Sequence, residues 1–275
     1  MMFNYDSYLR LDKFPLIWCS GCGDGIVLKA MIRAIDKLGL QKDDICMVSG
    51  IGCSSRLTGY VDFNTLHTTH GRALTFATGI KMAKPRLHVI VVTGDGDATA
   101  IGGNHYIHAA RRNIDITVIL FNNFIYGMTG GQVSPTTPKG KRASTAPFGN
   151  FENAFNISGL AQAAGASFVA RATVYNAVQL EKIIQRAIEK KGFSLVEVLS
   201  PCPTAYGRRN REGTPVDMIL QQKERNVNVA AVEKMTPEEL EGKIVTGVLT
   251  DIERPECREE YQKLIDSLSK EGGPR

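Results

Sequence analysis

The fold is decided by the stretch Leu87-His88-Val89-Ile90-Val91-Val92, which leads into the turn Gly94-Asp95-Gly96-Asp97. A near-continuous apolar run is typical of a parallel strand that helices cover on both faces. Glycines in the turn let the backbone approach a phosphate closely, and the helix predicted after it offers free N–H donors. Asp95 would repel a bare phosphate but suits a divalent cation that bridges to one.

Strands and helices are predicted to alternate on both sides of this stretch. Strands are predicted at about 45–49, 87–92, 116–121, 167–172 and 194–199, and helices at about 26–38, 71–83, 101–112, 158–164 and 176–190. The alternation predicts an α/β fold, with a parallel sheet, helices on both faces and right-handed crossovers. The long loop at about 124–155 is predicted to be a binding element or lid.

The chain is predicted to divide at residue 204. Residues 1–204 would form the α/β domain. Residues 205–275 are more polar, with a helix predicted at about 255–270. Since they have too few apolar residues for a core of their own, we expect an irregular extension that wraps the domain or a partner subunit.

Composition limits the class of protein. The 275 residues are 43% hydrophobic, and no apolar run reaches the ~18 residues of a membrane span. The N-terminus lacks the order of a signal peptide, so a cytoplasmic protein is predicted. The net charge is +5, and the basic clusters 139–142 and 208–211 lack interleaved aromatic residues. We expect them to be solvated surface or a docking patch for an acidic protein or substrate, with no nucleic-acid or membrane partner.

Four of the six cysteines fall where a parallel sheet would gather them. Cys19 and Cys22 form a Cys-Ser-Gly-Cys motif, and Cys53 and Cys202 follow strand-like runs. Four thiolates at one edge can hold an iron–sulfur cluster or a zinc ion, and the spacing leaves both open. The other two, Cys46 in a strand and Cys257 in a charged helix, are predicted to be a buried apolar thiol and an incidental one.

A second polar pair supports a cation site. Asn122-Asn123 ends the strand after the one that precedes Asp95, and Asn123 lies 28 positions beyond Asp95 (123 − 95). One strand–helix–strand unit therefore brings both side chains to the same sheet edge. A carboxylate, a side-chain amide and a nearby carbonyl are the oxygen ligands that Mg²⁺ prefers, with a diphosphate completing the shell.

At this spacing the chain resembles a known family. Gly94-Asp95-Gly96 followed by Asn122-Asn123 resembles the thiamine diphosphate motif. The segments Trp18–Gly23, Ile51–Ser54 and Ile125–Gln132 are similar to the β subunit of 2-oxoacid:ferredoxin oxidoreductases. The resemblance covers roughly residues 15–230, and its Tyr126–Gln132 form is most similar to 2-oxoglutarate-type subunits.

The resemblance implies a set of site residues. Asp95, Asn123 and the carbonyl of Ile125 would bind Mg²⁺, and Cys19, Cys22, Cys53 and Cys202 would hold a [4Fe–4S] cluster. Met128 would lie beside the substrate. From the residues themselves, His70 is the candidate for proton transfer or contact with the substrate carboxylate, with a loop histidine bonded to the backbone as the alternative, and Arg72 or partner residues would set the substrate preference. The thiamine diphosphate would be contacted by Ile51, Gly52, Cys53, Ser54, His70, Gly71, Arg72, Ala73, Gly94, Asp95, Gly96, Asp97, Asn123, Ile125, Gly127 and Met128.

The resemblance also implies a reaction and partners. A 2-oxoacid would be oxidatively decarboxylated, coenzyme A would take the acyl group, and the cluster would pass electrons to ferredoxin. The glutamate that thiamine enzymes use would come from an α subunit, so the chain alone would be inactive. 2-Oxoglutarate is the expected substrate, with pyruvate or a branched-chain 2-oxoacid as alternatives. A non-enzymatic Cys₄ zinc protein and a non-oxidative decarboxylase are the competing hypotheses.

Overall fold

The computed structural model describes residues 3–270 and is built around one eight-stranded sheet. Its strand order is β2-β1-β3-β4-β8-β7-β10-β9, and the six strands from β2 to β7 are parallel. β10 runs antiparallel to β7. The bounds are β1 (Ile45–Ser49), β2 (Asn64–His67), β3 (His88–Gly94), β4 (Thr117–Asn122), β7 (Phe168–Thr173), β8 (Ser194–Leu199), β9 (Asn226–Asn228) and β10 (Ile244–Asp251).

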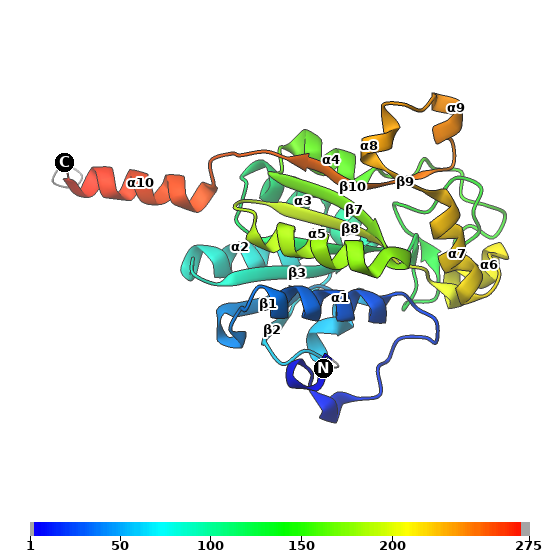
Figure 1. The fold of residues 1–275 in the computed structure, drawn as a ribbon, viewed down its shortest axis with the longest axis horizontal. Coiled ribbons are helices and arrows are strands. Elements are labelled where there is room, and N and C mark those ends of the chain that lie inside the picture. The colour runs from blue at the N-terminus through cyan, green and yellow to red at the C-terminus, as the bar shows by residue number, and fades with distance from the viewer. Residues whose placement is uncertain (1–2, 271–275) are drawn as a thin grey trace.

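Helices cover both faces of this sheet (Figure 1). Ile90 and Val92 of β3 pack in an apolar cluster with α1 (Asp24–Lys37) and α5 (Ala177–Glu189). Val89 and Val91 pack in a second cluster with α2 (Ala73–Ala83), α3 (Gly103–Arg111) and α4 (Ile157–Ala164). Successive side chains of a strand point to opposite faces, so a strand buried on both faces carries a near-continuous apolar run. The predicted α/β class is confirmed.

The carboxyl edge of the parallel strands carries most of the irregular structure. After β3 the chain enters a short π-helix (Asp97–Ile101), and α3 begins only after Gly102, so the helix predicted at 101–112 is divided. After β4 comes a small hairpin of β5 (Ile125–Tyr126) and β6 (Gln132–Val133). The predicted loop at 124–155 therefore contains this hairpin.

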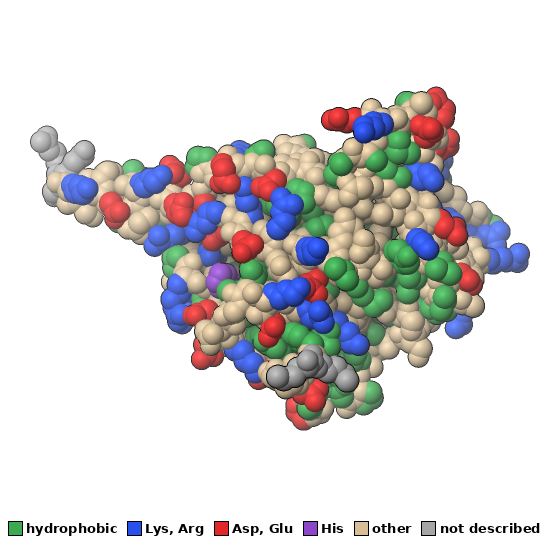
Figure 2. All heavy atoms as spheres, in the orientation of Figure 1, with side chains coloured by type: hydrophobic (Ala, Val, Ile, Leu, Met, Phe, Trp, Pro, Cys, Tyr) green, Lys and Arg blue, Asp and Glu red, His purple; other side chains and the backbone are tan. Residues whose placement is uncertain are grey.

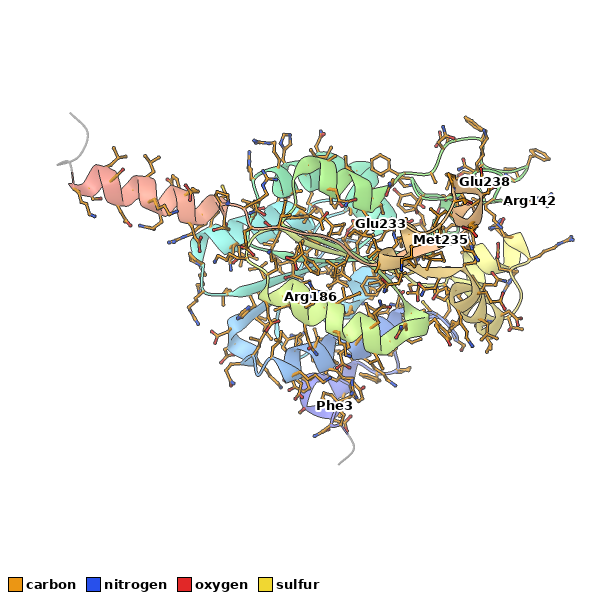
Figure 3. The ribbon with its side chains drawn as sticks, turned by 45° about the horizontal axis from the view of Figure 1, so that its top comes forward. Phe3, Arg142, Arg186, Glu233, Met235 and Glu238 are labelled. Atoms are coloured by element: carbon orange, nitrogen blue, oxygen red, sulfur yellow. The ribbon has the colours of Figure 1, made fainter. Side chains whose placement is uncertain are left out.

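The C-terminal segment lies at two places. α6 (Arg208–Asn210) and α7 (Pro215–Arg225) sit at the carboxyl edge, followed by α8 (Val229–Val232) and α9 (Pro237–Leu240). In Figure 3, Arg142 and Glu238 lie at the end opposite α10 (Cys257–Lys270), which extends away from the body. β2, β9 and β10 were not predicted, and β10 extends the main sheet beside β7. The division at residue 204 stays a prediction. None of the helices in residues 3–270 is both long and apolar enough to span a membrane.

Candidate active site

Asp95 lies at the carboxyl end of β3 and is only 3% exposed. Its Oδ2 atom accepts hydrogen bonds from the hydroxyl groups of Ser134 (2.7 Å) and Thr136, which follow β6. Burial raises the pKa of Asp95 to about 6, although these hydrogen bonds lower it. A divalent cation beside the carboxylate would favour the charged form, so the position suits a metal ligand.

The two asparagines that end β4 have different surroundings. Asn122 is buried, and its Nδ2 donates to Oε1 of Glu197 at 2.8 Å. Asn123 lines a cleft instead, and its Oδ1 accepts from the backbone N–H of Ile125 at 3.2 Å. Between them and the hairpin, Phe124 has φ of 64°, a left-handed conformation that is uncommon for a residue with a Cβ. This turn brings Asn123 and Ile125 to the same cleft as Asp95.

The cleft lies at the carboxyl edge, as the sequence predicted. Every predicted cofactor contact lines it except Gly71, Arg72 and Ala73. Tyr126 and Thr129 also line it and were not predicted. Its full lining is Ile51, Gly52, Cys53, Ser54, His70, Gly94, Asp95, Gly96, Asp97, Asn123, Ile125, Tyr126, Gly127, Met128 and Thr129.

Tyr126 explains why Gly96 is a glycine. The Tyr126 hydroxyl donates to the carbonyl of Gly96 at 3.1 Å. A Cβ at position 96 would overlap the Tyr126 ring, well inside van der Waals contact. The ring therefore packs directly on the backbone of the turn and forms one wall of the cleft.

The Asp97 carboxylate joins three segments that surround the cleft. Oδ1 contacts Nδ1 of His70 (2.6 Å) and accepts from the backbone N–H groups of Gly71 (2.8 Å) and Ile51 (3.2 Å). Oδ2 accepts from the hydroxyl of Thr93 at 2.7 Å. Because protein donors occupy both oxygens, only the backbone of Asp97 remains free to contact a diphosphate. With Nδ1 of His70 held by Asp97, the ring's other nitrogen, Nε2, is the one free to act in the cleft.

Arg72 does not line the cleft. Its Nη1 donates to the carbonyl of Ile101 at 3.2 Å, at the end of the π-helix. Met128 does line the cleft, and its side chain is 45% exposed. Of the three side chains predicted to act on the substrate, the structure therefore brings His70 and Met128 together and leaves Arg72 outside.

The four cysteines approach one another beside the cleft. The Sγ atoms of Cys53 and Cys202 lie 3.6 and 3.5 Å from the position that a Cβ would take on Gly127. The Trp18 indole N–H donates to the Cys53 carbonyl at 2.8 Å, which joins the segment before Cys19 to Cys53. Cys53 also lines the cleft, so one residue belongs to both sites.

Burial favours the protonated form of three of these thiols in the metal-free chain. It raises the pKa of Cys53 to about 12 and also raises the pKa values of Cys22 and Cys202. The negative charge of Asp24 raises all three further. Asp24 accepts from the Ser200 hydroxyl at 2.8 Å, and burial raises its own pKa to about 6. A metal centre would reverse the effect on the thiols, since thiolates are the ligand form.

The arrangement differs from a closed site for a single ion. Within residues 3–270 no three His, Cys, Asp or Glu side chains are close enough to hold one metal ion. Cys46 is buried in β1 and Cys257 begins α10.

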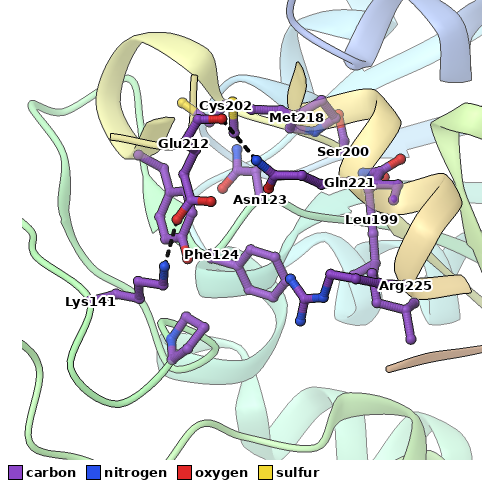
Figure 4. A pocket seen from close by; sticks show the side chains of 15 residues that line it. Asn123, Phe124, Lys141, Leu199, Ser200, Cys202, Glu212, Met218, Gln221 and Arg225 are labelled. Atoms are coloured by element: carbon purple, nitrogen blue, oxygen red, sulfur yellow. Dashed lines mark hydrogen bonds and ion pairs between the residues drawn. The ribbon is translucent and has the colours of Figure 1, made fainter. Parts of the chain in front are cut away.

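A second cavity adjoins Asn123 and Cys202 (Figure 4). Its wall includes Lys141 from the loop after β6 and Glu212 from the segment after Cys202. These two side chains form an ion pair of 2.6 Å across the cavity. The segment that follows Cys202 is thereby tied to the loop that carries Ser134 and Thr136.

The chain is similar to known proteins in both sequence and structure. Residues 50–198 match the family described as thiamine pyrophosphate enzyme, C-terminal TPP binding domain. The 2-oxoglutarate synthase subunit KorB of Methanocaldococcus jannaschii is 55% identical over 264 residues, which cover 96% of this chain and 98% of the relative. KorB of Archaeoglobus fulgidus is 49% identical over 270 residues, covering 98% and 95%.

This chain belongs to the KorB family.

A solved structure agrees with the KorB relatives. It is a 2-oxoglutarate:ferredoxin oxidoreductase from Magnetococcus marinus with 2-oxoglutarate, coenzyme A and succinyl-CoA bound. It matches with a TM-score of 0.85 and 33% identity, over 99% of this chain and 92% of that one. The predicted family and its 2-oxoglutarate type are confirmed, as is the thiamine diphosphate-binding fold.

Two features of the site could not be predicted from the sequence. Ser134 and Thr136 contact Asp95 from 39 and 41 positions away. Their signal was indirect: the loop at 124–155 was predicted to bind a ligand, but no spacing rule indicated which of its hydroxyls would turn inward. Tyr126 lay inside a quoted motif, yet its contact with Gly96 depends on the tertiary fold.

Proposed function

We propose that this chain is the β subunit that binds thiamine diphosphate, Mg²⁺ and a [4Fe–4S] cluster in a 2-oxoglutarate:ferredoxin oxidoreductase. The complex would convert 2-oxoglutarate and coenzyme A to succinyl-CoA and carbon dioxide, passing two electrons to ferredoxin, or run in reverse. One observation carries the proposal. Cys53 lines the same cleft as Asp95 and Asn123, while its Sγ lies beside Cys202 across Gly127. The cofactor and its electron acceptor would therefore be neighbours.

The Mg²⁺ ligands would be Asp95, Asn123 and the carbonyl of Ile125. Hard oxygen donors from two neighbouring strand ends support this set. The diphosphate would lie against the backbone of Gly96 and Asp97, at the start of a helical segment. The absence of a Cβ at Gly96 leaves room for Tyr126, which would hold the cofactor from the side.

Bound thiamine diphosphate supplies the nucleophilic carbon and the electron sink for decarboxylation. Around it, His70 is the chain's proton-transfer group, since Asp97 fixes its Nδ1 and leaves Nε2 available. Met128 and Gly127 would form the wall between substrate and cysteines. No Lys or Arg is among the described residues that line the cleft, so a cation for the distal carboxylate of 2-oxoglutarate would come from the partner.

The cleft also supports dependence on an α subunit. Among its described lining residues the only carboxylates are Asp95 and Asp97. Asp97 is occupied by four protein donors, and Asp95 is assigned to the cation. Neither is left to act on the aminopyrimidine ring. The glutamate for that step would have to come from another chain, and the β subunit alone would be inactive.

Location in the cytoplasm is part of the proposal. Each of the six cysteines is free within the described residues. Free cysteines in this number suit a reducing compartment, where thiols remain available as metal ligands.

The test combines spectroscopy with turnover of the co-expressed αβ complex. Under anaerobic conditions the complex should show visible iron–sulfur absorption that dithionite bleaches, and it should reduce a viologen dye with 2-oxoglutarate and coenzyme A. Cys202→Ser should lose the visible absorption and the viologen reduction but still bind thiamine diphosphate. Cys257→Ser should keep the absorption, the activity and the bound cofactor. A colourless, zinc-loaded complex would favour the zinc-protein hypothesis. Free aldehyde without an electron acceptor would indicate non-oxidative decarboxylation, and faster turnover of pyruvate would correct the substrate.

A further inference from the structure

Two basic segments that are far apart in the sequence meet on the surface. They are Lys139–Arg142, in the loop after β6, and Arg208–Arg211, which includes α6. The backbone N–H of Arg142 donates to Oδ1 of Asn210 at 2.7 Å, and Nδ2 of Asn210 donates to the Arg142 carbonyl at 3.0 Å. These two hydrogen bonds hold the segments edge to edge, so their cations form one surface.

The surface carries a strong local excess of positive charge. Lys141 is neutralised by Glu212, and in the part of the chain that the structure describes none of the other cations forms an ion pair. We call these exposed side chains the basic rim: Lys139, Arg142, Arg208, Arg209 and Arg211. Figure 2 shows Lys and Arg side chains protruding from the end of the molecule where Figure 1 places α6.

The basic rim is connected directly to Cys202. The backbone carbonyl of Cys202 accepts a hydrogen bond from the N–H of Gly207 at 2.9 Å, which closes a turn. Arg208 is the next residue after this turn. Nη2 of Arg209 then donates to the carbonyl of Gly130 at 3.3 Å.

The same contact relates the rim to the cleft. Gly130 belongs to the turn between β5 and β6 that begins at Gly127, and Gly127 lies next to the sulfur atoms of Cys53 and Cys202. Two short backbone segments therefore connect the cysteines to the basic rim: the turn from Gly127 to Gly130, which also borders the cleft, and the segment from Cys202 to Arg209. A cluster held by these cysteines would be closer to the rim than to surfaces on the far side of the sheet.

We propose that the basic rim is the docking surface for an acidic electron-carrier protein that oxidises the cluster. This inference rests on the proposed function, because it needs a cluster at Cys202. Each 2-oxoacid oxidised would release two electrons, and each docked carrier would take one electron from the reduced cluster and leave it oxidised. Two encounters would complete a turnover. Charge complementarity favours an acidic partner, since five exposed cations face solvent without an acidic partner among the described residues.

The rim suits transient docking better than tight binding. Single exposed ion pairs contribute little to affinity, whereas a patch of one sign raises association rates by 10–10³ at low salt. Fast, salt-sensitive encounters are what an electron carrier needs, because it must also leave. The effect should therefore appear in the KM for the carrier and in its dependence on ionic strength.

The experiment uses the αβ complex with the double variant Arg142→Glu/Arg208→Glu. No hydrogen bond or ion pair within residues 3–270 involves either side chain, so the change reverses charge without removing a structural contact. With an acidic ferredoxin at low salt, KM should rise about tenfold or more, and the difference should shrink as salt is added. Viologen reduction, the KM values for coenzyme A and 2-oxoglutarate, and α-subunit retention should stay unchanged.

Two controls sharpen the result. Arg142→Lys/Arg208→Lys keeps the charge and should behave as the wild type. Lys182→Glu reverses an exposed charge on α5 and should leave the KM for ferredoxin unchanged. An unchanged KM for ferredoxin in the double Glu variant overturns the inference, as does a raised KM for coenzyme A or loss of the α subunit. A wild-type complex that cannot reduce viologen would instead refute the proposed function, and the docking inference with it.

Discussion

Replacing Asp97 by alanine tests whether this carboxylate holds the cleft together. The change removes the acceptor for four donors, from Ile51, His70, Gly71 and Thr93. Ile51 and His70 lie at the cleft surface, and their donors can bind water instead. The Gly71 N–H and the Thr93 hydroxyl are buried and would be left without that acceptor.

The magnitude follows from these two buried donors. A buried group left without a partner costs about 1–3 kcal/mol, so the pair costs about 2–6 kcal/mol. The Thr93 hydroxyl lies 3.4 Å from the Gly94 carbonyl and can donate to it, which offsets part of the cost of losing Asp97. We therefore expect the free energy of unfolding to fall by about 3 kcal/mol, in the lower half of this range. Asp97→Asn keeps one acceptor oxygen and should lose about 1 kcal/mol. The Ile51 and His70 segments should also loosen, so cofactor affinity should fall in the same order.

Urea unfolding of the metal-free chain measures these differences, and titration of the αβ complex with Mg²⁺ and thiamine diphosphate measures affinity. Asp43→Ala is a suitable control, because Asp43 is exposed and its side chain makes no hydrogen bond or ion pair in residues 3–270. It should change stability by less than about 0.5 kcal/mol. A loss below about 1 kcal/mol for Asp97→Ala, or equal losses for the Ala and Asn variants, would contradict the role assigned to this carboxylate.

Two further predictions concern the same turn. Gly96→Ala should displace the Tyr126 ring, lower the free energy of unfolding by about 1–3 kcal/mol through overpacking and weaken thiamine diphosphate binding. Gly79→Ala, in open space on α2, should instead raise the free energy of unfolding by up to about 1 kcal/mol. Thermal unfolding of both variants measures whether stability falls in the first and rises in the second. Mg²⁺-dependent cofactor affinity should fall as pH drops through about 6, because a proton then competes with the cation for Asp95. Titration calorimetry of the αβ complex at pH 5.5 and 7.5 checks this, and equal affinities would show that Asp95 is not a ligand.

Much of the fold could be predicted because its strands are buried on both faces. The strands carry uninterrupted apolar runs such as Val89–Val92 in β3 and Val118–Phe121 in β4, and the helices between them have regular apolar spacing. β10 was not predicted because it lacks a continuous apolar run. It contains Thr246, Gly247 and Thr250, pairs with β7 at an irregular register and lies near the edge of the sheet. Its place depends on tertiary pairing, which a local pattern does not encode.

The sequence predicted the site residues that follow strand ends, but it did not predict those that loops bring to the site. Asp95, Asn123 and Cys53 follow strands and meet in one cleft, as their spacing indicated. Arg72 lies two residues beyond His70, but the left-handed Gly71 between them turns the chain, and Arg72 bonds to the π-helix instead. Ser134 and Thr136 reach Asp95 from a loop whose path no periodicity describes.

The two carboxylates of the Gly94–Asp97 turn should respond to substitution in opposite ways. Residues two apart at the start of a helix point to nearly opposite sides, so Asp95 faces Ser134 and Thr136 while Asp97 faces His70 and Gly71. Burial raises the pKa of Asp95 above the value of about 4 expected in the unfolded chain. The metal-free protein therefore binds this proton more tightly when folded, and stability from Asp95 falls as pH rises from about 4 to 6.

Asp95→Asn removes this buried charge and keeps an oxygen for the two hydroxyls. We expect the metal-free variant to be as stable as the wild type at pH 7.5 or more stable, by up to about 3 kcal/mol, with a flatter dependence on pH. Its Mg²⁺-dependent cofactor binding should nevertheless be lost. Asp97→Asn should show the reverse: lower stability, with Mg²⁺ still required for binding. If both variants lost stability and kept binding, both carboxylates would be structural, and the cation would have to be held elsewhere in the cleft.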